Sequence, residues 1–416
     1  TSVRTAGGTA PLDADRRATV ERLLAEAGGQ GARTIAVATR AGVSRATLEA
    51  ADEAELVFEG ILLFSDPPKA GIAETLADLR SLGVGVRVVT GDSDLVAVAV
   101  AKQVGLKVKG VLTGDEIQRL GPTAFAARAD QTTIFARVDP DQKLRVIRAL
   151  QGRGATVGYL GDGINDAPPL HVADVGISVD NGTDVARAAA DIVLLQPSLA
   201  AIAQGVREGR RTFANTLKYV RMGISSNFGN MLSMAGAAVL LPFLPMLPSQ
   251  ILLNNLIYDA SQTAIPSDDI DPETETEPAR WDIGGIERFM LVFGPISSIF
   301  DYATFALLLG VLHASEPEFH TGWFVESLAT QVLVIFAIRT RRSPFWRSRP
   351  SRLLVVAAAV AVLVAIVLPL SPLAGLLGFE PLPPLFWLLL VGLVALYLAI
   401  VEIAKRWTFR SSLVPS

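Results

Sequence analysis

The segment from Gly161 to Asp166, which reads Gly-Asp-Gly-Ile-Asn-Asp, is the part of the chain best equipped for chemistry. It places Asp162 and Asp166 four residues apart, directly after an apolar run that is typical of a buried strand. Glycines allow the backbone to turn sharply there, and carboxylate oxygens are ligands that hard cations prefer. The segment therefore predicts a magnesium site formed by Asp162 and Asp166; a plain Asp-Gly turn is the alternative.

Two other motifs carry groups that a phosphoryl group requires. Thr90, Gly91 and Asp92 follow a second apolar run, and Lys143 lies near the start of a predicted helix. Hydrogen-bond donors and a fixed positive charge stabilise a phosphoryl group during its transfer. Thr90 and Lys143 can supply both, although a Thr-Gly-Asp turn or a surface lysine is uninformative on its own.

Strand and helix patterns alternate around these motifs. We expect buried strands at 57–63, 84–89, 132–136 and 156–160, and helices at 71–81 and 141–151. Such alternation predicts a parallel sheet with helices on both faces, in which ligands bind at the carboxyl ends of the strands. The motifs fall at those ends. Before residue 55 the sequence predicts one helix, 14–27, and one short strand, 34–38.

Long apolar runs dominate the chain after residue 211. Half of all residues are hydrophobic and the mean hydropathy is +0.41. About 20 apolar residues cross the ~30 Å of a bilayer core. A buried globular helix would explain one such run, but six in a row favour a membrane bundle. We expect spans at 217–241, 249–266, 289–312, 324–338, 353–370 and 385–403.

Composition excludes some classes of function. The chain has no cysteine, so disulfides, thiolate catalysis and cysteine metal sites are excluded within it. The net charge of −4 gives no support for a nucleic-acid partner.

Basic residues predict the orientation of the spans. The loops at 242–248, 313–322 and 371–384 contain no lysine or arginine. Basic residues gather instead on the other side, at Arg207, Arg210, Arg211, Lys218, Arg221, Arg339, Arg341, Arg342, Arg347, Arg349, Arg352, Lys405, Arg406 and Arg410. The positive-inside rule then places the soluble part and the C-terminus in the cytoplasm of a multi-pass cell-membrane protein. We expect the acidic segment 268–277 to be a solvated cytoplasmic loop.

Polar side chains inside the expected spans mark an ion path, because such groups usually face a bundle interior or an ion route. Asn227 and Asn230 are three residues apart in the first span, and Asn255 and Asp259 are four apart in the second. Both spacings put the pair on one helix face, and amide plus carboxylate oxygens suit a hard divalent ion. Interhelical hydrogen bonding is the alternative. Asp301 in the third span is either a further path residue or a group paired inside the bundle.

Together these motifs resemble P-type cation-transporting ATPases. The segment 65–69, Ser-Asp-Pro-Pro-Lys, is similar to the hinge after the nucleotide-binding domain, and the run 162–169 is similar to one of the family's most specific signatures. The resemblance implies an α/β haloacid-dehalogenase-like, Rossmann-like phosphorylation domain at 56–210, followed by an all-α transmembrane bundle of six helices at 211–416. Residues 1–55 are similar to a remnant of the nucleotide-binding domain.

The resemblance also implies roles for single residues. It assigns catalysis to Thr90, Gly91, Asp92, Lys143 and Asn165, and binding of the cofactor Mg²⁺ to Asp162 and Asp166. Because the Asn-Leu-x-x-Asp run resembles the family's transport-site segment, it assigns the transported ion to Asn230, Asn255 and Asp259. ATP is the implied energy source, the transported divalent cation and the lipid bilayer are the implied partners, and nucleic acid is not one.

The ion that the resemblance favours is magnesium. Stretches 255–266, 280–282 and 288–301 resemble magnesium-transporting more than calcium or proton pumps. Calcium pumps usually carry an acidic residue where this chain has Asn230. Fewer direct charges suit a partly hydrated ion, which magnesium prefers to be.

The sequence departs from the family's pattern at the nucleophile. The family's phosphorylated aspartate lies in an Asp-Lys-Thr-Gly-Thr motif, and no such run occurs in the 416 residues. Without it no aspartyl phosphate forms, so we expect a fragment, inactive alone, that reaches ATP through a missing N-terminal part. The alternatives are a calcium- or proton-type pump, a membrane-tethered phosphatase of the dehalogenase type, or a non-catalytic remnant.

Overall fold

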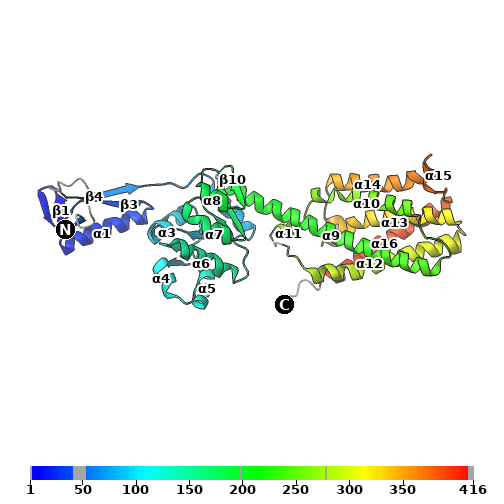
Figure 1. Cartoon of the computed structure of the whole chain (residues 1–416), viewed down its shortest axis with the longest axis horizontal. Coiled ribbons are helices and arrows are strands. Elements are labelled where there is room, and N and C mark those ends of the chain that lie inside the picture. The colour runs from blue at the N-terminus through cyan, green and yellow to red at the C-terminus, as the bar shows by residue number, and fades with distance from the viewer. Residues whose placement is uncertain (1, 41–52, 197, 277–278, 411–416) are drawn as a thin grey trace. The chain divides into compact units, whose positions relative to one another are not determined.

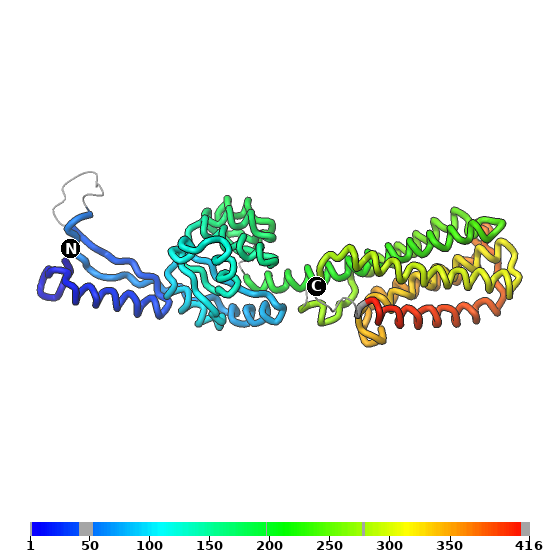
Figure 2. Tube along the Cα trace, turned by 90° about the horizontal axis from the view of Figure 1, so that it is seen from below, coloured from blue at the N-terminus to red at the C-terminus, as the bar shows by residue number. Residues whose placement is uncertain are grey.

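The computed structural model describes residues 2–40, 53–196, 198–276 and 279–410. The chain divides into two compact units, Thr1–Gly205 and Val206–Ser416, and each is described by itself. Figure 1 labels their elements and Figure 2 follows the chain trace.

The first unit begins with a four-stranded sheet in the order β2-β1-β4-β3, accompanied by helix α1 at Ala14–Gly29. Its strands are β1 (Ser2–Thr5), β2 (Gly8–Pro11), β3 (Arg33–Thr39) and β4 (Val57–Phe64). The prediction of a buried strand at 57–63 in the parallel sheet was wrong. β4 pairs antiparallel with β3 and parallel with β1, and the side chains of Leu62, Leu63 and Phe64 are at least half exposed.

The rest of this unit contains two three-stranded sheets, in the orders β5-β7-β6 and β10-β9-β8, and all their pairs are parallel. The strands are β5 (Val88–Val89), β6 (Val111–Thr113), β7 (Ile134–Ala136), β8 (Gly158–Leu160), β9 (Val175–Val179) and β10 (Ile192–Leu194). β5 and β8, which precede the two acidic motifs, are both edge strands. The alternating pattern thus predicted parallel pairing, while the division into two sheets was not foreseen.

Short helices follow the strands and cover them with apolar residues. They are α2 (Ile72–Ser81), α3 (Asp94–Gln103), α4 (Gly114–Arg119), α5 (Pro122–Gln131), α6 (Pro140–Gln151), α7 (Ala167–Val172) and α8 (Asp184–Ala189), with a 3₁₀ turn at Ile164–Asp166. Leu112, Ile117 and Phe135 form one fully buried core. A second core between α6, α7 and α8 contains Ile147 and Leu170. These cores fix the strand ends that carry the motifs.

The second unit is helical. α9 (Leu199–Leu240) starts shortly before it, and the unit continues with α10 (Pro248–Gln262), α11 (Pro272–Thr276), α12 (Ile283–Ala306), α13 (Glu316–Ile338), α14 (Arg352–Val367), α15 (Ala374–Leu377) and α16 (Pro384–Arg410). A π-helical turn at Leu307–Val311 extends α12, and 3₁₀ turns lie at Ile265–Ser267, Phe345–Arg347 and Leu368–Leu370. Both views show α12, α13, α14 and α16 running side by side.

Four helical segments in the described chain are long and apolar enough to cross a membrane: Ile283–Val311, Glu316–Ile338, Arg352–Leu370 and Pro384–Thr408. The expected first two spans, in α9 and α10, are not among them. α10 has only 15 residues, and the asparagines and serines of α9 dilute its apolar character. Its apolar helices therefore indicate a membrane protein, with four candidate spans in the described chain.

α13 is the central helix of this bundle. About 83% of its apolar window is buried, against 28% for α14 and 22% for α16, whose remaining surface suits lipid. α9 and α12 approach closely through glycines, since a Cβ at Gly229 would lie 3.0 Å from the Gly294 carbonyl oxygen. Small residues at such contacts are typical of membrane helix packing.

Candidate functional site

Asp166 is the best-connected residue of the predicted phosphoryl-transfer motifs. It lies at the end of the turn after β8 and is 9% exposed. Its Oδ1 accepts hydrogen bonds from Lys143 Nζ at 2.7 Å and from the Tyr159 hydroxyl at 2.8 Å, and its Oδ2 accepts from the backbone N–H of Gly163 at 3.1 Å. A Cβ at Gly161 would lie only 2.5 Å from Asp166 Cβ, so this close approach requires glycine.

Electrostatics keeps Asp166 ionised. Burial by itself would raise the pKa of its carboxyl, but the hydrogen bonds from Lys143, Tyr159 and Gly163 outweigh burial and lower the pKa. The pKa of Tyr159 is raised by burial, by its bond to Asp166 and by the charges of Asp166 and Asp162. Both carboxylates therefore lie near the same hydroxyl group.

Lys143 joins the carboxyl ends of the two parallel sheets. It lies in the first turns of α6, which follows β7, whereas Asp166 follows β8. Asp139 and Gln142 form a capping box and Pro140 occupies the first turn, so the start of α6 is fixed locally. The Lys143–Asp166 ion pair is 15% and 12% exposed at its side chains, which leaves it reachable from the sheet ends.

Thr90 and Asp92 lie in the turn after β5, held by the backbone of the neighbouring loop. Thr90 N–H donates to the Phe135 carbonyl, and Val138 N–H donates to the Thr90 carbonyl. The Thr90 hydroxyl accepts from Asp92 N–H at 3.1 Å, and the Asp92 carboxylate pairs with Arg33 at 2.7 Å. Thr90 thus adjoins the segment that leads into α6 and Lys143, while Asp92 faces Arg33 instead.

Asp162, Asn165 and Gly91 are exposed at the strand ends. The Asp162 carbonyl accepts from Thr183 N–H, which anchors its backbone while its carboxylate stays accessible. In the part of the chain that the structure describes, no three acidic or histidine side chains gather as a metal cluster. The exposed carboxylate of Asp162 beside the held carboxylate of Asp166 is a donor set that fits one hard cation bound together with phosphate oxygens.

The predicted ion ligands occupy different environments in the second unit. Asn230 on α9 is half-buried, and its Oδ1 accepts from Gln331 Nε2 of α13 at 3.1 Å. Asn255 and Asp259 lie on one face of α10, and both are exposed. The neighbouring Asn254 and Tyr258 point the other way and are buried. The structure does not bring Asn230 into hydrogen-bond contact with Asn255 or Asp259.

Asp301 on α12 is a paired group inside the bundle. It is 2% exposed, and its two oxygens accept from the Ser233 hydroxyl at 2.5 Å and from Trp323 Nε1 at 2.8 Å. Asp301 therefore links α9, α12 and α13. It is a group paired inside the bundle, which was the second of the two interpretations given for it.

Comparison with known proteins decides the family. Residues 10–174 match the family described as haloacid dehalogenase-like hydrolase, and residues 243–407 match the family described as cation transporting ATPase, C-terminus. The magnesium-transporting ATPase, P-type 1, of Salmonella typhimurium is 45% identical over 415 residues, which is 99% of this chain and 46% of that protein. Its Escherichia coli K12 counterpart is 46% identical over 98% of the chain and 46% of its own length.

The chain is homologous to the P-type ATPases. It spans about half the length of the curated relatives that it matches. The calcium-transporting ATPase of Bacillus subtilis is a more distant P-type relative, 30% identical over 94% of the chain and 45% of its own length. The predicted resemblance to P-type ATPases, and within them to the magnesium-transporting branch, is thereby confirmed.

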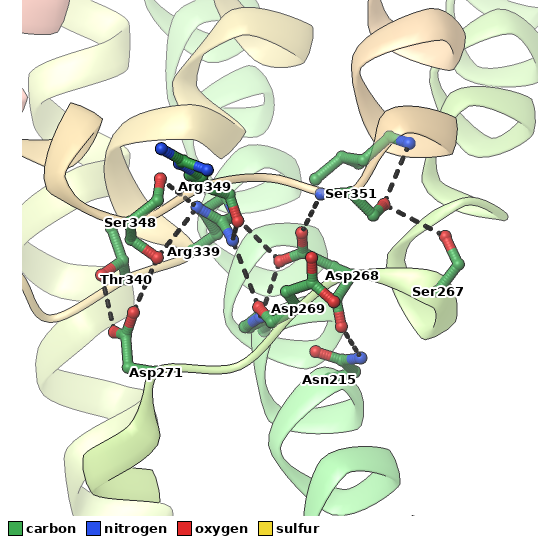
Figure 3. Close-up of polar contacts among 12 residues, drawn as sticks. Asn215, Ser267, Asp268, Asp269, Asp271, Arg339, Thr340, Ser348, Arg349 and Ser351 are labelled. Atoms are coloured by element: carbon green, nitrogen blue, oxygen red, sulfur yellow. Dashed lines mark hydrogen bonds and ion pairs between the residues drawn. The ribbon is translucent and has the colours of Figure 1, made fainter.

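Sequence reasoning missed a charged junction in this P-type chain, centred on Asp268 (Figure 3). The prediction that 268–277 is a solvated loop was wrong at its start, because Asp268 is completely buried. Its carboxylate accepts from Lys218 of α9 at 2.7 Å, from Arg339 at the end of α13 at 2.8 Å and from Ser351 N–H before α14 at 3.1 Å. Hydrogen bonds from both cations outweigh burial, which by itself would raise the pKa, and lower the pKa of Asp268.

The rest of the junction satisfies the backbone around Asp268. Asn215 donates to the Pro266 and Asp268 carbonyls, and Asp271 accepts from Thr340 and Ser348. Arg339 also donates to the Ser348 and Arg349 carbonyls. The segment that leaves α10 is thus tied to α9, α13 and the start of α14. The available signal was an arginine directly after an apolar helix, at the start of a basic segment, together with the Asp-Asp-Ile-Asp run at 268–271.

Proposed function

We propose that this chain forms the C-terminal part of an ATP-driven pump that moves a divalent cation, Mg²⁺, across the cell membrane. The observation that carries the proposal is 45% identity along 99% of the chain to a magnesium-transporting ATPase, against 30% for the calcium-transporting relative. Asn230, in place of an acidic residue, favours the same ion because magnesium keeps part of its water shell.

In this proposal the first unit handles the phosphoryl group. Thr90 and Lys143 bind its oxygens, Asp162 and Asp166 hold Mg²⁺, and Asn165, Gly91 and Asp92 shape the turns around them. Bound Mg²⁺ supplies charge neutralisation at the phosphate oxygens. The Lys143 ammonium has three donors, so it can keep Asp166 at 2.7 Å and still donate to a phosphoryl oxygen.

The phosphorylated aspartate must come from outside the 416 residues. β5 and β8 each offer an unpaired edge in the described sheets, and Thr90 and Asp162 follow those two strands. Open strand edges are templates for a further strand. A strand from the rest of the pump, parallel to β5 and β8 and between them, places an Asp-Lys-Thr-Gly-Thr nucleophile beside both motifs. ATP then reaches the site through that other part.

The second unit carries the ion in this proposal. Asn230, Asn255 and Asp259 are its ligands, and α9 and α10 are two further spans beside the four apolar ones, which gives the six of the predicted bundle. The exposed face of α10 that bears Asn255 and Asp259 is then covered by helices from the rest of the pump. The basic residues on one side of the spans put the first unit and the C-terminus in the cytoplasm.

The coding region upstream offers a first test. An in-frame Asp-Lys-Thr-Gly-Thr motif before Thr1 supports the pump, whereas its absence favours a non-catalytic remnant. A membrane-tethered phosphatase is a weaker alternative, because it leaves the polar residues of α9 and α10 unexplained.

Ion flux is the decisive test. The complete pump, with this chain joined to the other half found in its relatives, is placed in proteoliposomes at fixed, saturating MgATP. We expect Asp259→Ala to abolish Mg²⁺ flux and Asp269→Ala, at an exposed carboxylate outside the ion path, to leave it intact. Unchanged flux in Asp259→Ala overturns the site, and flux of calcium or protons in place of magnesium overturns the ion.

A further inference from the structure

A small internal cavity lies one helical turn from Asn230 in the second unit. It has a volume of about 20 Å³ and is bounded by α9, α10, α12, α13 and α16. Its polar lining includes Ser226, Tyr258, Ser297 and Gln331. A space of roughly 10–15 Å³ holds one water molecule, so this cavity accommodates at least one.

Three residues that line the cavity each carry a buried polar atom that makes no hydrogen bond of normal geometry within the described chain. These atoms are the Ser226 hydroxyl, the Tyr258 hydroxyl and Gln331 Oε1. The two hydroxyls lie close to each other and Tyr258 is also close to Gln262, so Gln331 Oε1 is the atom left without a neighbouring partner among them. Gln331 is 4% exposed and Tyr258 is 5% exposed. Leaving a buried atom such as Gln331 Oε1 unpaired costs about 1–3 kcal/mol. Apolar cavities stay dry, but polar cavities with unpaired atoms take up water.

The lining of the cavity suits water better than a bare cation. No charged side chain of the described chain lines the cavity. A divalent ion stripped of its water needs carboxylates to offset its desolvation, and magnesium gives up water reluctantly. Neutral hydroxyl and amide oxygens instead match the hydrogen-bonding needs of a water molecule.

Gln331 connects this cavity to the proposed ion site. Its Nε2 donates to Asn230 Oδ1 at 3.1 Å and to the Ser327 hydroxyl at 2.5 Å, while its Oε1 is buried without a partner in the described chain and the residue lines the cavity. An amide oxygen has two lone pairs, so Asn230 Oδ1 can accept from Gln331 and still bind a cation. The same side chain thus orients the ion ligand and touches the water space.

We propose that the cavity is a hydration site of the ion route, in which water held by Gln331, Ser226 and Tyr258 accompanies the cation at Asn230. The inference rests on the proposed function of Asn230, Asn255 and Asp259. Gln331 is a positioning residue in it, since it acts through Asn230 and through water. The site favours Mg²⁺, which crosses partly hydrated, over Ca²⁺, which sheds water more readily.

Two measurements test the inference. A density map of this chain in lipid, at a resolution that shows ordered water, is expected to contain a peak within hydrogen-bonding distance of Gln331 Oε1. In proteoliposomes with the complete pump at fixed MgATP, Gln331→Leu is expected to raise the KM for Mg²⁺ flux about tenfold, because a hydrogen bond to a charged assembly is lost. The ratio of Mg²⁺ to Ca²⁺ transport is expected to fall with it.

Controls separate the possible failures. Val334→Ala enlarges the same cavity without removing a polar atom and is expected to keep the Mg²⁺ preference. Tyr258→Phe and Ser226→Ala are near-isosteric, so they report on the site even if Gln331→Leu fails to fold. An empty cavity, or an equal loss of Mg²⁺ and Ca²⁺ flux in these variants, overturns the hydration site. If Asp259→Ala and Asn255→Ala also transport normally, the proposed function itself has failed.

Discussion

The two units each hold a buried carboxylate bound to lysine, and the difference between these centres is instructive. Asp166 has one cationic partner, and its ion pair retains some exposure at the end of open-edged sheets. Both carboxylates accept three hydrogen bonds, one of them from a backbone N–H, but Asp268 has two cationic partners and no exposure. A centre with a single cationic partner and some exposure can exchange that partner for a ligand, whereas a closed centre can only hold its elements together.

Neutralising Asp268 is expected to have the largest effect on stability. Asp268→Asn leaves Lys218 and Arg339 buried without their countercharge, which typically costs 3–5 kcal/mol. Unfolding of the chain in mixed micelles, followed by denaturant titration, measures it. Asp269→Asn is the matched control, because the Asp269 carboxylate is 64% exposed and is expected to change stability by less than about 0.5 kcal/mol. Equal effects of the two variants contradict the closed junction.

Removing Lys143 is expected to cost less. Lys143→Met takes away one of three donors from Asp166, and the loss of a partly exposed charged hydrogen bond corresponds to about 1–2 kcal/mol. Tyr159 and Gly163 still hold the carboxylate. The same substitution at the exposed Lys107 serves as control. A loss as large as that of Asp268→Asn shows that the first centre is closed as well.

The acid side of the stability profile sharpens the comparison. Both carboxyls have a folded pKa below the ordinary value near 4. Their contribution is therefore complete above that ordinary value and disappears as pH falls through the lower folded pKa. In Lys143→Met, Asp166 loses one of the hydrogen bonds that lower its pKa, so burial raises that pKa. The loss of stability on acidification is therefore expected to begin at a higher pH. Denaturant midpoints measured between neutral and acid pH check this, and an unshifted onset contradicts the role of Lys143.

The smallest effect is expected at the exposed pair of Arg4 and Glu59. Hydrogen bonds from Arg4 and Thr39 lower the pKa of Glu59 to about 2. Because both side chains are exposed and water screens surface pairs, Arg4→Ala is expected to raise that pKa only slightly and to leave the unfolding midpoint nearly unchanged. A larger rise in the folded pKa would correspond to a matching loss of stability. NMR titration of the Glu59 carboxyl gives the pKa. A clear drop in stability is the result that this interpretation does not allow.

Much of the candidate site was accessible from the sequence because its geometry is local. The Gly161–Asp166 turn, the strand before it and the capped start of α6 follow from residues close together in the chain. Tyr159 was missed, although a buried tyrosine usually directs its hydroxyl to a partner. The exposed placement of Asn255 and Asp259 depends on which helices pack against α10, which spacing along α10 does not reveal.

The sequence by itself determined the family, the strand and helix alternation, and most of the apolar spans, because each of these is encoded in the spacing of neighbouring residues. The tertiary structure decided which polar groups are buried and paired and which remain accessible. Asp268 and Arg339 lie 71 residues apart, and Asn230 and Gln331 lie 101 apart. Burial and pairing over such separations depend on the packing of whole helices. The burial of Asp268 in the junction therefore cannot be predicted from the acidic segment alone.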